Sequence, residues 1–414
     1  MGALAALFVL AAQLCLIDQR VFAGPQGVPD DALQALEAGN PAAAEISLRK
    51  ASATDPGDYS IHFNLALALS MQNKDAEAET ELRRTLELLP GLYEAEMNLG
   101  ILLLRNRRPG DAVEPLKAAA EAKPTLARPN LFYAQALFET GATTAAAEHY
   151  GIAAQADAKS APAQLGWARA LLKVNPEDAE PHYRQAAELD PQLHGALLEL
   201  AVAYDRAGKT DEAITLYREV PESAEAKSRL PALLAAKNDF AAAIPGLEQI
   251  VKAAPNVPNR LALAEAYRLN KQPDLAFGQF QLAVTADGGN YDLRMRFGRA
   301  LRDERKLMPA AEQFLAAAKI QPDSVQAWNE LASVLIVAEN YQQGLAALDR
   351  VRALGKEIPG DLYYRALCFD KLRQPKPALE AYQQFVAADG GKLPDQEFVA
   401  RQRIRNIETE LKRR

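Results

Sequence analysis

A small residue recurs along this chain at a nearly constant interval, and this repeat is the feature that most constrains the fold. Its members are Ala44, Ala78, Ala112, Ala146, Ala179, Ala213, Ala243, Ala276, Ala310, Gly344 and Ala378. Neighbouring members are 34 residues apart except for two gaps of 33 and one of 30. A repeat of this length indicates a solenoid of stacked helical hairpins, each too small to bury its apolar face alone.

Two further series share the period. Twelve positions earlier in most units stand Ala66, Gly100, Ala134, Ala168, Ala201, Pro231, Ala264, Gly298, Ala332 and Ala366. Four positions after the first series stand Leu48, Leu82, Leu116, Tyr150, Tyr183, Tyr217, Leu247, Phe280, Phe314, Leu348 and Tyr382. Two antiparallel helices approach closely only where a side chain is small, and a large side chain then fills the adjacent hole. The pattern predicts an all-α chain.

The ends of the helices are marked by turn and breaker residues. Polar segments such as 72–75, 207–210 and 237–239 separate the two helices of a unit. Twelve positions after the first series, proline or glycine occurs in most units, for example at Pro56 and Pro90, and neither residue continues a helix.

This pattern resembles the tetratricopeptide repeat family, whose unit has small, aromatic and proline residues at set positions. Asn98-Leu99-Gly100 with Ala112, Leu116, Ala119 and Pro124 matches it, as do Phe297-Gly298 with Ala310, Phe314, Ala317 and Pro322. The resemblance covers residues 25–390 in about eleven units. It implies an α-solenoid, a right-handed superhelix of antiparallel helical hairpins.

Two places depart from the regular pattern. The unit around Ala213 is shortened to 30 residues, with Pro221 ending its second helix early and Pro231 replacing a small residue, so we expect an irregularity over residues 218–232. Residues 391–414 have no partner helix in sequence. Ala400, Ile404, Ile407 and Leu411 form one apolar stripe there, which predicts a C-terminal capping helix rather than a basic partner-binding or membrane-surface helix.

The N-terminus predicts a secretory leader. Ala3 to Ile17 is almost wholly apolar, and Val21-Phe22-Ala23 offers a cleavage site, so residues 1–23 are expected to be a signal peptide cleaved after Ala23. The run is short for a membrane span, and none is expected after cleavage. The protein would be secreted or periplasmic, and the alternative is an N-terminal membrane anchor.

The composition argues against several functions. The net charge is -7 with both signs interspersed, which disfavours nucleic acid. The four histidines and Cys368 have no metal-ligand spacing, and no phosphate loop or nucleophile motif occurs. Cys368 is expected to be a small buried side chain. We therefore expect no enzyme activity, no cofactor and no metal.

In the family that the chain resembles, the first helix of each unit lines a concave groove. The corresponding candidates for partner binding are Phe63, Leu67, Met97, Ile101, Leu131, Phe138, Arg169, Arg206, Arg268, Arg299, Arg302 and Asn329. They are mostly apolar in the N-terminal half and polar in the later units. Any one of them could instead pack on its neighbour, or pair within its helix as Arg299 could with Asp303.

The resemblance implies a protein interaction scaffold that binds a peptide or protein partner in this groove. The Lys and Asn pair that clamps chaperone C-termini in some relatives is absent from the corresponding positions. The alternative is a structural subunit of a cell-envelope or secretion assembly that uses its convex face or its termini. The sequence leaves the partner and the oligomeric state open.

Overall fold

The computed structural model describes residues 27–413, and every regular element in that range is helical. The helices divide into two compact units, residues 1–223 and 224–414, of which the first is described from residue 27. The expected leader, residues 1–23, lies outside the described residues. No helix in the described range combines the length and the apolar character needed to cross a membrane.

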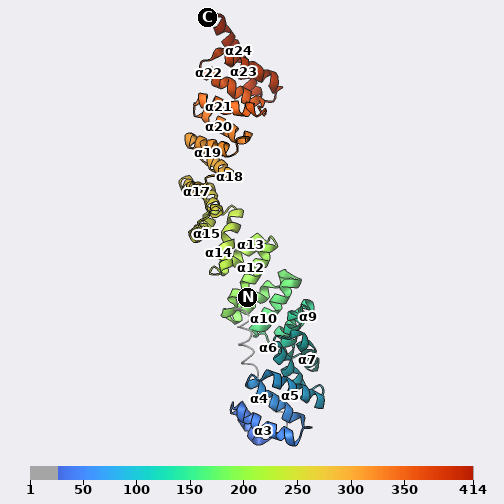
Figure 1. The fold of residues 1–414 in the computed structure, drawn as a ribbon. Coiled ribbons are helices and arrows are strands. Elements are labelled where there is room, and N and C mark those ends of the chain that lie inside the picture. The colour runs from blue at the N-terminus through green and yellow to red at the C-terminus, as the bar shows by residue number, and fades with distance from the viewer. Residues whose placement is uncertain (1–26, 414) are drawn as a thin grey trace. The chain divides into compact units, whose positions relative to one another are not determined.

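In the first unit, antiparallel helix pairs follow one another along the chain (Figure 1). The first helices of the pairs are α2 (Asp30–Glu37), α4 (Tyr59–Met71), α6 (Tyr93–Arg105), α8 (Ala127–Glu139), α10 (Ala161–Val174) and α12 (Leu197–Arg206). The second helices are α3 (Pro41–Thr54), α5 (Asp75–Leu88), α7 (Pro109–Ala122), α9 (Thr143–Ala156), α11 (Glu180–Leu189) and α13 (Thr210–Glu219).

The second unit is built in the same way (Figure 1). Its first helices are α14 (Ala224–Ala236), α16 (Val257–Leu269), α18 (Tyr291–Asp303), α20 (Val325–Val337) and α22 (Pro359–Lys371). Its second helices are α15 (Phe240–Ala253), α17 (Pro273–Ala286), α19 (Leu307–Ile320), α21 (Tyr341–Ala353) and α23 (Pro375–Asp389), and α24 (Pro394–Arg413) follows them. The solenoid of helical hairpins expected from the sequence is confirmed.

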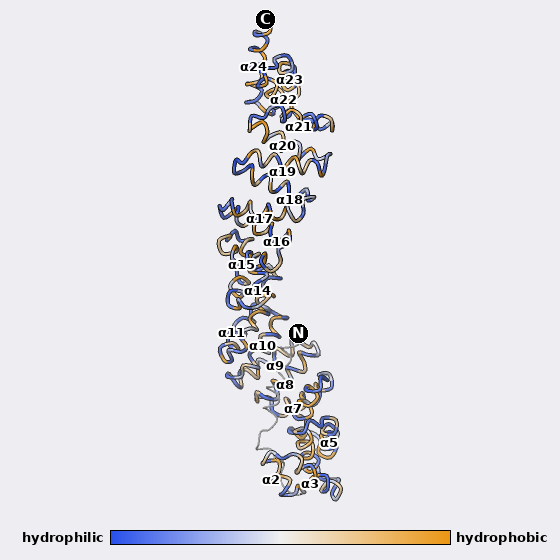
Figure 2. Tube along the Cα trace, turned by 60° about the vertical axis from the view of Figure 1, so that its left-hand side comes forward, coloured by the Kyte–Doolittle hydropathy of each residue, from blue (hydrophilic) through white to orange (hydrophobic). Residues whose placement is uncertain are grey.

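Each hairpin closes on the small and large residues of the repeat. A Cβ added to Gly100 would lie 2.3 Å from Cγ of Leu116, and one added to Gly298 would lie 2.6 Å from Cε1 of Phe314. All members of the first small-residue series are buried, as are Leu116 and Phe314. Hydrophobic and hydrophilic residues are interspersed along the helices of both units, as Figure 2 shows. The predicted small-to-large packing is confirmed at these positions.

The turns inside the hairpins, except the one between α10 and α11, each contain a residue with left-handed backbone. Gly39, Gly141 and Gly208 have positive φ there, as glycine readily does. Asn73, Arg107, Asn238, Lys271, Arg305, Glu339 and Arg373 adopt the same conformation with φ between 57° and 62°. The chain thus keeps one turn geometry even where the residue disfavours it.

The helices depart from the regular pattern over residues 218–232, where the sequence predicts an irregularity. Helix α13 has 10 residues where α5 has 14, and it ends at Glu219, just before Pro221. Pro231 stands inside α14 and is buried. A Cβ on Gly246 of α15 would lie 2.3 Å from Cγ of Pro231. The small residue has therefore moved to the facing helix, which leaves room for the proline ring.

A second irregularity was not expected from the sequence. The turn after α10 is replaced by a 3-10 helix, η1 (Pro176–Asp178), and another, η2 (Pro191–Ala196), precedes α12. Proline begins both segments, and Asn175 has an extended backbone rather than the left-handed one found in the other turns. Proline at the first position fixes φ and favours such short helical turns.

Helix α24 covers the last hairpin. Ala400 and Ile407 are buried in a cluster with Ala366, Tyr382 and Phe385, and Ile404 and Leu411 pack against the same cluster. Arg403 pairs with Asp370 of α22 at 2.6 Å. The apolar stripe read from the sequence is thus the face that α24 buries.

Candidate partner-binding groove

The first helices of neighbouring hairpins touch one another in the first unit. Helix α8 contacts both α6 and α10 directly, in addition to its own partner α9. The sides of the first helices that face away from their second helices therefore adjoin one another at α6, α8 and α10. This surface is the candidate groove.

In the first unit the groove carries partly exposed apolar side chains. Leu67, Leu131 and Phe138, all expected from the sequence, are half-buried and pack at the edge of the hydrophobic core. Leu172 of α10 is also half-buried. The ammonium of Lys173 lies 4.7 Å from the ring centroid of Phe138, a favourable cation–π distance. These positions offer apolar contact with a nearby cation.

Three of the expected groove residues lie deeper than the sequence suggested. Phe63, Met97 and Ile101 belong to the core, and none is more than 4% exposed. They support the groove from beneath but present almost no surface to a partner. Helical position gives the direction of a side chain, whereas its burial depends on how closely the next hairpin packs.

Arg169 and Arg206 differ in their surroundings. Arg169 of α10 donates to both carboxylate oxygens of Glu199 on α12, at 3.0 and 2.7 Å. The hydroxyl of Tyr183 donates to the same carboxylate at 3.0 Å, and burial raises the pKa of Tyr183. Arg169 therefore joins two hairpins, whereas Arg206 is exposed at the end of α12.

In the second unit, the arginines that the sequence predicts for the groove are paired with acids. Arg268 donates to Glu265 at 2.8 Å. Arg299 donates to Glu330 of the next first helix at 3.0 Å, and Arg302 donates to the same carboxylate and to Asp303. Pairing of Arg299 with Asp303 was considered from the sequence, but Arg299 instead bonds to Glu330 on α20. Two guanidinium groups thus share one carboxylate across neighbouring hairpins.

Asn329, the last of the expected residues, lies partly buried on α20. Its Oδ1 atom is buried and has no hydrogen-bond partner. The structure brings Arg299, Arg302 and Glu330 together and places Asn329 on the same helix as Glu330.

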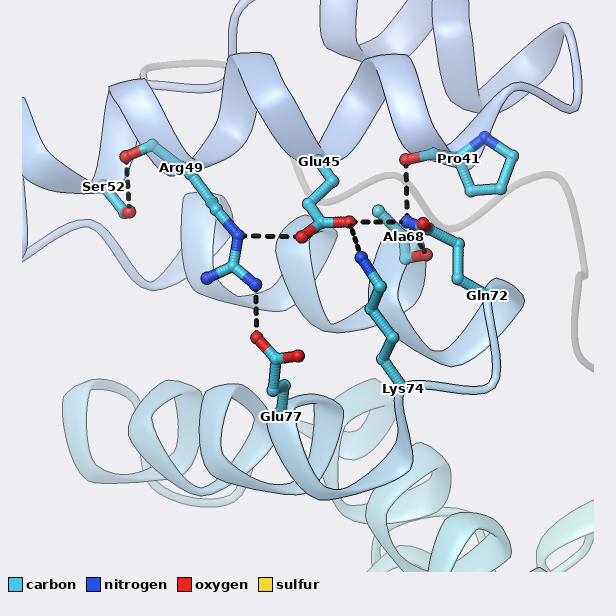
Figure 3. A network of polar contacts seen from close by, with 8 residues as sticks. All are labelled: Pro41, Glu45, Arg49, Ser52, Ala68, Gln72, Lys74 and Glu77. Atoms are coloured by element: carbon cyan, nitrogen blue, oxygen red, sulfur yellow. Dashed lines mark hydrogen bonds and ion pairs between the residues drawn. The ribbon is translucent and has the colours of Figure 1, made fainter.

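An ionic network that the sequence did not reveal joins the first hairpins (Figure 3). Glu45 of α3 accepts hydrogen bonds from Lys74 at 2.7 Å, from Arg49 at 2.8 Å and from Gln72 at 2.8 Å. Arg49 also donates to Glu77 of α5. The bonds from Lys74 and then from Arg49 lower the pKa of Glu45 to about 2. The partners of Glu45 lie between 4 and 29 residues from it in sequence. Only the pair of Glu45 and Arg49, four residues apart on one helix, has a spacing that a sequence pattern can reveal.

Three of the histidines form hydrogen bonds between the two helices of their own hairpin, and Cys368 is buried. His62 bonds to Glu81 at 2.6 Å, His149 to Asn130 at 2.8 Å and His182 to Gln164 at 2.9 Å. Cys368 is buried, as expected, and burial raises the pKa of its thiol to about 12. Over residues 27–413, no three His, Cys, Asp or Glu side chains are grouped so as to hold a metal ion.

The stacked helical hairpins place this protein in the class of helical-repeat solenoids. Tetratricopeptide repeat profiles match residues 30–93, 76–127, 97–161, 174–237, 295–361 and 362–389, which together span more than half of the chain. The chain therefore belongs to the tetratricopeptide repeat family. The number of repeats, about eleven, stays a prediction.

No curated protein matches the chain. Solved structures that resemble it include MamA 41-end from Desulfovibrio magneticus RS-1, at 20% identity over 40% of this chain and 98% of that one, with a TM-score of 0.37. Another is YrrB, described as a TPR protein with an unusual peptide-binding site, at 17% identity over 47% of this chain and all of that one, with a TM-score of 0.41.

Proposed function

We propose that this protein is a non-enzymatic scaffold that binds a peptide or protein partner along its first helices. The observation that carries the proposal is the row of half-buried apolar side chains in the first unit, including Leu67, Leu131, Phe138 and Leu172. A peptide-binding surface needs apolar side chains that stay partly accessible after the helices have packed, as these do.

The second unit supports the proposal through charged rather than apolar side chains. Arg299 and Arg302 are 38% and 37% exposed while they bond to Glu330, so they can turn toward a partner without leaving a deeply buried charge. We infer that the first unit contacts apolar segments of a partner and that the second unit contacts charged segments. Partner selectivity would then depend on both kinds of contact.

Affinity capture from the source cell tests this proposal. We expect Leu172→Glu in the first unit and Arg299→Glu in the second to reduce partner recovery several-fold. Matched controls are Ile152→Glu on α9 and Leu282→Glu on α17, whose side chains are 36% and 48% exposed on second helices. Circular dichroism shows whether each variant is folded. Equal recovery by folded Leu172→Glu and wild type would overturn the groove assignment.

A second function is favoured by exposed apolar side chains on second helices. Leu275 and Leu282 of α17 and Met308 and Leu315 of α19 are between 37% and 52% exposed. Side chains of this size on the outer helices fit a structural subunit of a cell-envelope or secretion assembly. In that case Leu282→Glu, rather than Leu172→Glu, would abolish recovery in the same capture experiment.

We also propose that the protein is secreted or periplasmic, with a leader cleaved after Ala23, or else N-terminally anchored. The apolar run from Ala3 to Ile17 supports this proposal. N-terminal sequencing of the protein from its source cell tests it. A mature protein that begins at Gly24 would support cleavage, and one that begins at Met1 or Gly2 would contradict it.

A further inference from the structure

A cavity lies at the C-terminal end of the second unit, where α24 folds over the last hairpin. Its volume is about 360 Å³, at the lower end of the range for small-ligand sites. The walls come from the start of α22, from the end of α23 and from the beginning of α24. Tyr363 in this wall holds the place in α22 that Asn329 holds in α20, because the two are one 34-residue repeat apart.

The walls of the cavity are mainly apolar and aromatic. Ile358, Pro359 and Leu393 line it together with Tyr363 and Tyr364. The ring centroid of Tyr363 lies 5.9 Å from that of Tyr364 and 5.3 Å from that of Phe385. Ile358 and Tyr364 remain 56% and 42% exposed, so their apolar surface has no cover within the described chain.

One wall residue, Asp389, carries a buried carboxylate with an unused oxygen. The side chain is 0% exposed. Its Oδ2 accepts a hydrogen bond from the backbone N–H of Leu393 at 2.9 Å, which fixes the turn before α24. Its Oδ1 is buried and has no hydrogen-bond partner. A buried oxygen of this kind costs free energy unless a donor reaches it.

The charges around the cavity favour a cationic donor. Asp361, which lies next to the wall residue Gly360, is a second buried acid, and its Oδ2 accepts the backbone N–H of Ile358 at 3.0 Å. The buried cation nearby, Arg365, uses Nε to bond to Glu357 at 2.9 Å and Nη1 to bond to Asp349, while its Nη2 has no partner. Lys392 in the wall is exposed, and solvent screens its charge.

We propose that this cavity binds an ammonium or guanidinium group carried on an apolar stem. The cation would donate to Oδ1 of Asp389 and lie against the rings of Tyr363 and Tyr364, while the stem contacts Ile358 and Leu393. Such a group occurs in free alkylamines and in the lysine and arginine side chains of polypeptides. The inference does not depend on the proposed groove contacts, because it rests on the carboxylate of Asp389 and the rings beside it.

A ligand-observed NMR titration of the full-length protein tests the proposal. The probes are n-butylammonium, Nα-acetyl-lysine methylamide and the neutral analogue 1-butanol. We expect at least one ammonium probe to bind, and 1-butanol to bind about tenfold more weakly because it lacks the charge. Tighter binding of the lysine probe identifies a polypeptide as the source of the cation, and tighter binding of n-butylammonium identifies a free amine.

Variants separate the cavity from general surface binding. Asp389→Asn keeps the shape and the bond to Leu393 but removes the charge, and we expect it to weaken ammonium binding about tenfold. The matched control is Asp395→Asn, which removes an exposed charge at the start of α24. If Asp389→Asn fails to fold, Tyr364→Ala, at a partly exposed wall position, should weaken binding several-fold.

The proposal is overturned if neither ammonium probe binds the wild-type protein, or if 1-butanol binds as tightly as they do. It is also overturned if folded Asp389→Asn, or folded Tyr364→Ala in its place, binds like wild type. Failure of the capture experiment on the groove would leave these outcomes unchanged, because the small probes report on the cavity alone.

Discussion

The carboxylate of Glu45 on α3 accepts a hydrogen bond at 2.7 Å from the ammonium of Lys74, the residue directly before α5. The contact ties the second helices of two consecutive hairpins together through charge (Figure 3). Because neighbouring hairpins depend on each other for stability, one interface bond influences how the end of the solenoid unfolds.

Acid should weaken this contact in a defined pH window. The pKa of Glu45 falls from 4.5 to about 2 in the folded chain, so its stabilising effect is complete above pH 4.5 and is lost as the pH falls toward 2. We expect Glu45→Gln to lower the free energy of unfolding by about 1 kcal/mol at pH 7, because its exposed partners are screened by solvent. Urea unfolding followed by circular dichroism measures this difference.

The control for Glu45 is Glu121→Gln, which removes an exposed acid 3.9 Å from Lys117. We expect it to have little effect at any pH. Glu45→Gln could instead change the free energy of unfolding by the same amount at pH 7 and at pH 2.5. That result would show that the charge of Glu45 does not stabilise the fold.

Gly100 should not tolerate a methyl group. An alanine Cβ there would lie 2.3 Å from Cγ of Leu116, so Leu116 would have to move within a packed hairpin. We expect Gly100→Ala to lower the free energy of unfolding by about 1–3 kcal/mol. Gly110 on α7 is the control, since a Cβ there meets nothing within 4 Å, and Gly110→Ala should be neutral or stabilising. Equal melting temperatures for the two variants would contradict the close approach.

The left-handed turn residues should respond in opposite directions to substitution. Glu339 is exposed and has φ of 60°, so Glu339→Gly should raise the free energy of unfolding by up to about 1 kcal/mol as the steric cost disappears. Gly141 has φ of 89°, and Gly141→Ala should lower it by a similar amount. Thermal melts of both variants test this, and a destabilised Glu339→Gly would show that the side chain of Glu339 contributes an unseen contact.

The order of the hairpins could be predicted from the sequence because the packing rule is local and repeated. Small residues such as Gly100 and large ones such as Leu116 recur in phase, and a helix pair has one way to place them together. The same rule could not predict the positive φ of Arg107 or Arg305. Closure of the hairpin forces these residues into the left-handed conformation, which arginine does not favour by itself.

The candidate groove was predicted only in outline. The sequence shows that Phe63 and Leu67 face the same side of α4, but the depth at which Phe63 is buried depends on neighbouring hairpins. Likewise, the bond from Arg299 to Glu330 joins residues 31 positions apart, and no pattern within one helix reveals it. Burial and pairing across units are properties of the stacked structure.

Pro231 and Gly246 offer the sharpest test of how the chain accommodates an irregular position. Proline inside α14 removes a helical hydrogen bond, and its ring occupies the space where a Cβ on Gly246 would lie. Gly246→Ala should therefore destabilise the wild-type protein by at least about 1 kcal/mol. In a Pro231→Ala background the clash is gone, and the same change should be neutral or stabilising because alanine favours the helix.

The free energies of unfolding of wild type, the two single variants and the double variant form a cycle that isolates this coupling. Gly278 of α17 provides the matched control, because a Cβ there meets nothing within 4 Å, so Gly278→Ala should have the same effect with or without Pro231. Additive effects of Pro231→Ala and Gly246→Ala would mean that the proline ring and the glycine do not compensate each other. A positive coupling would show that the missing small residue of α14 is supplied by α15.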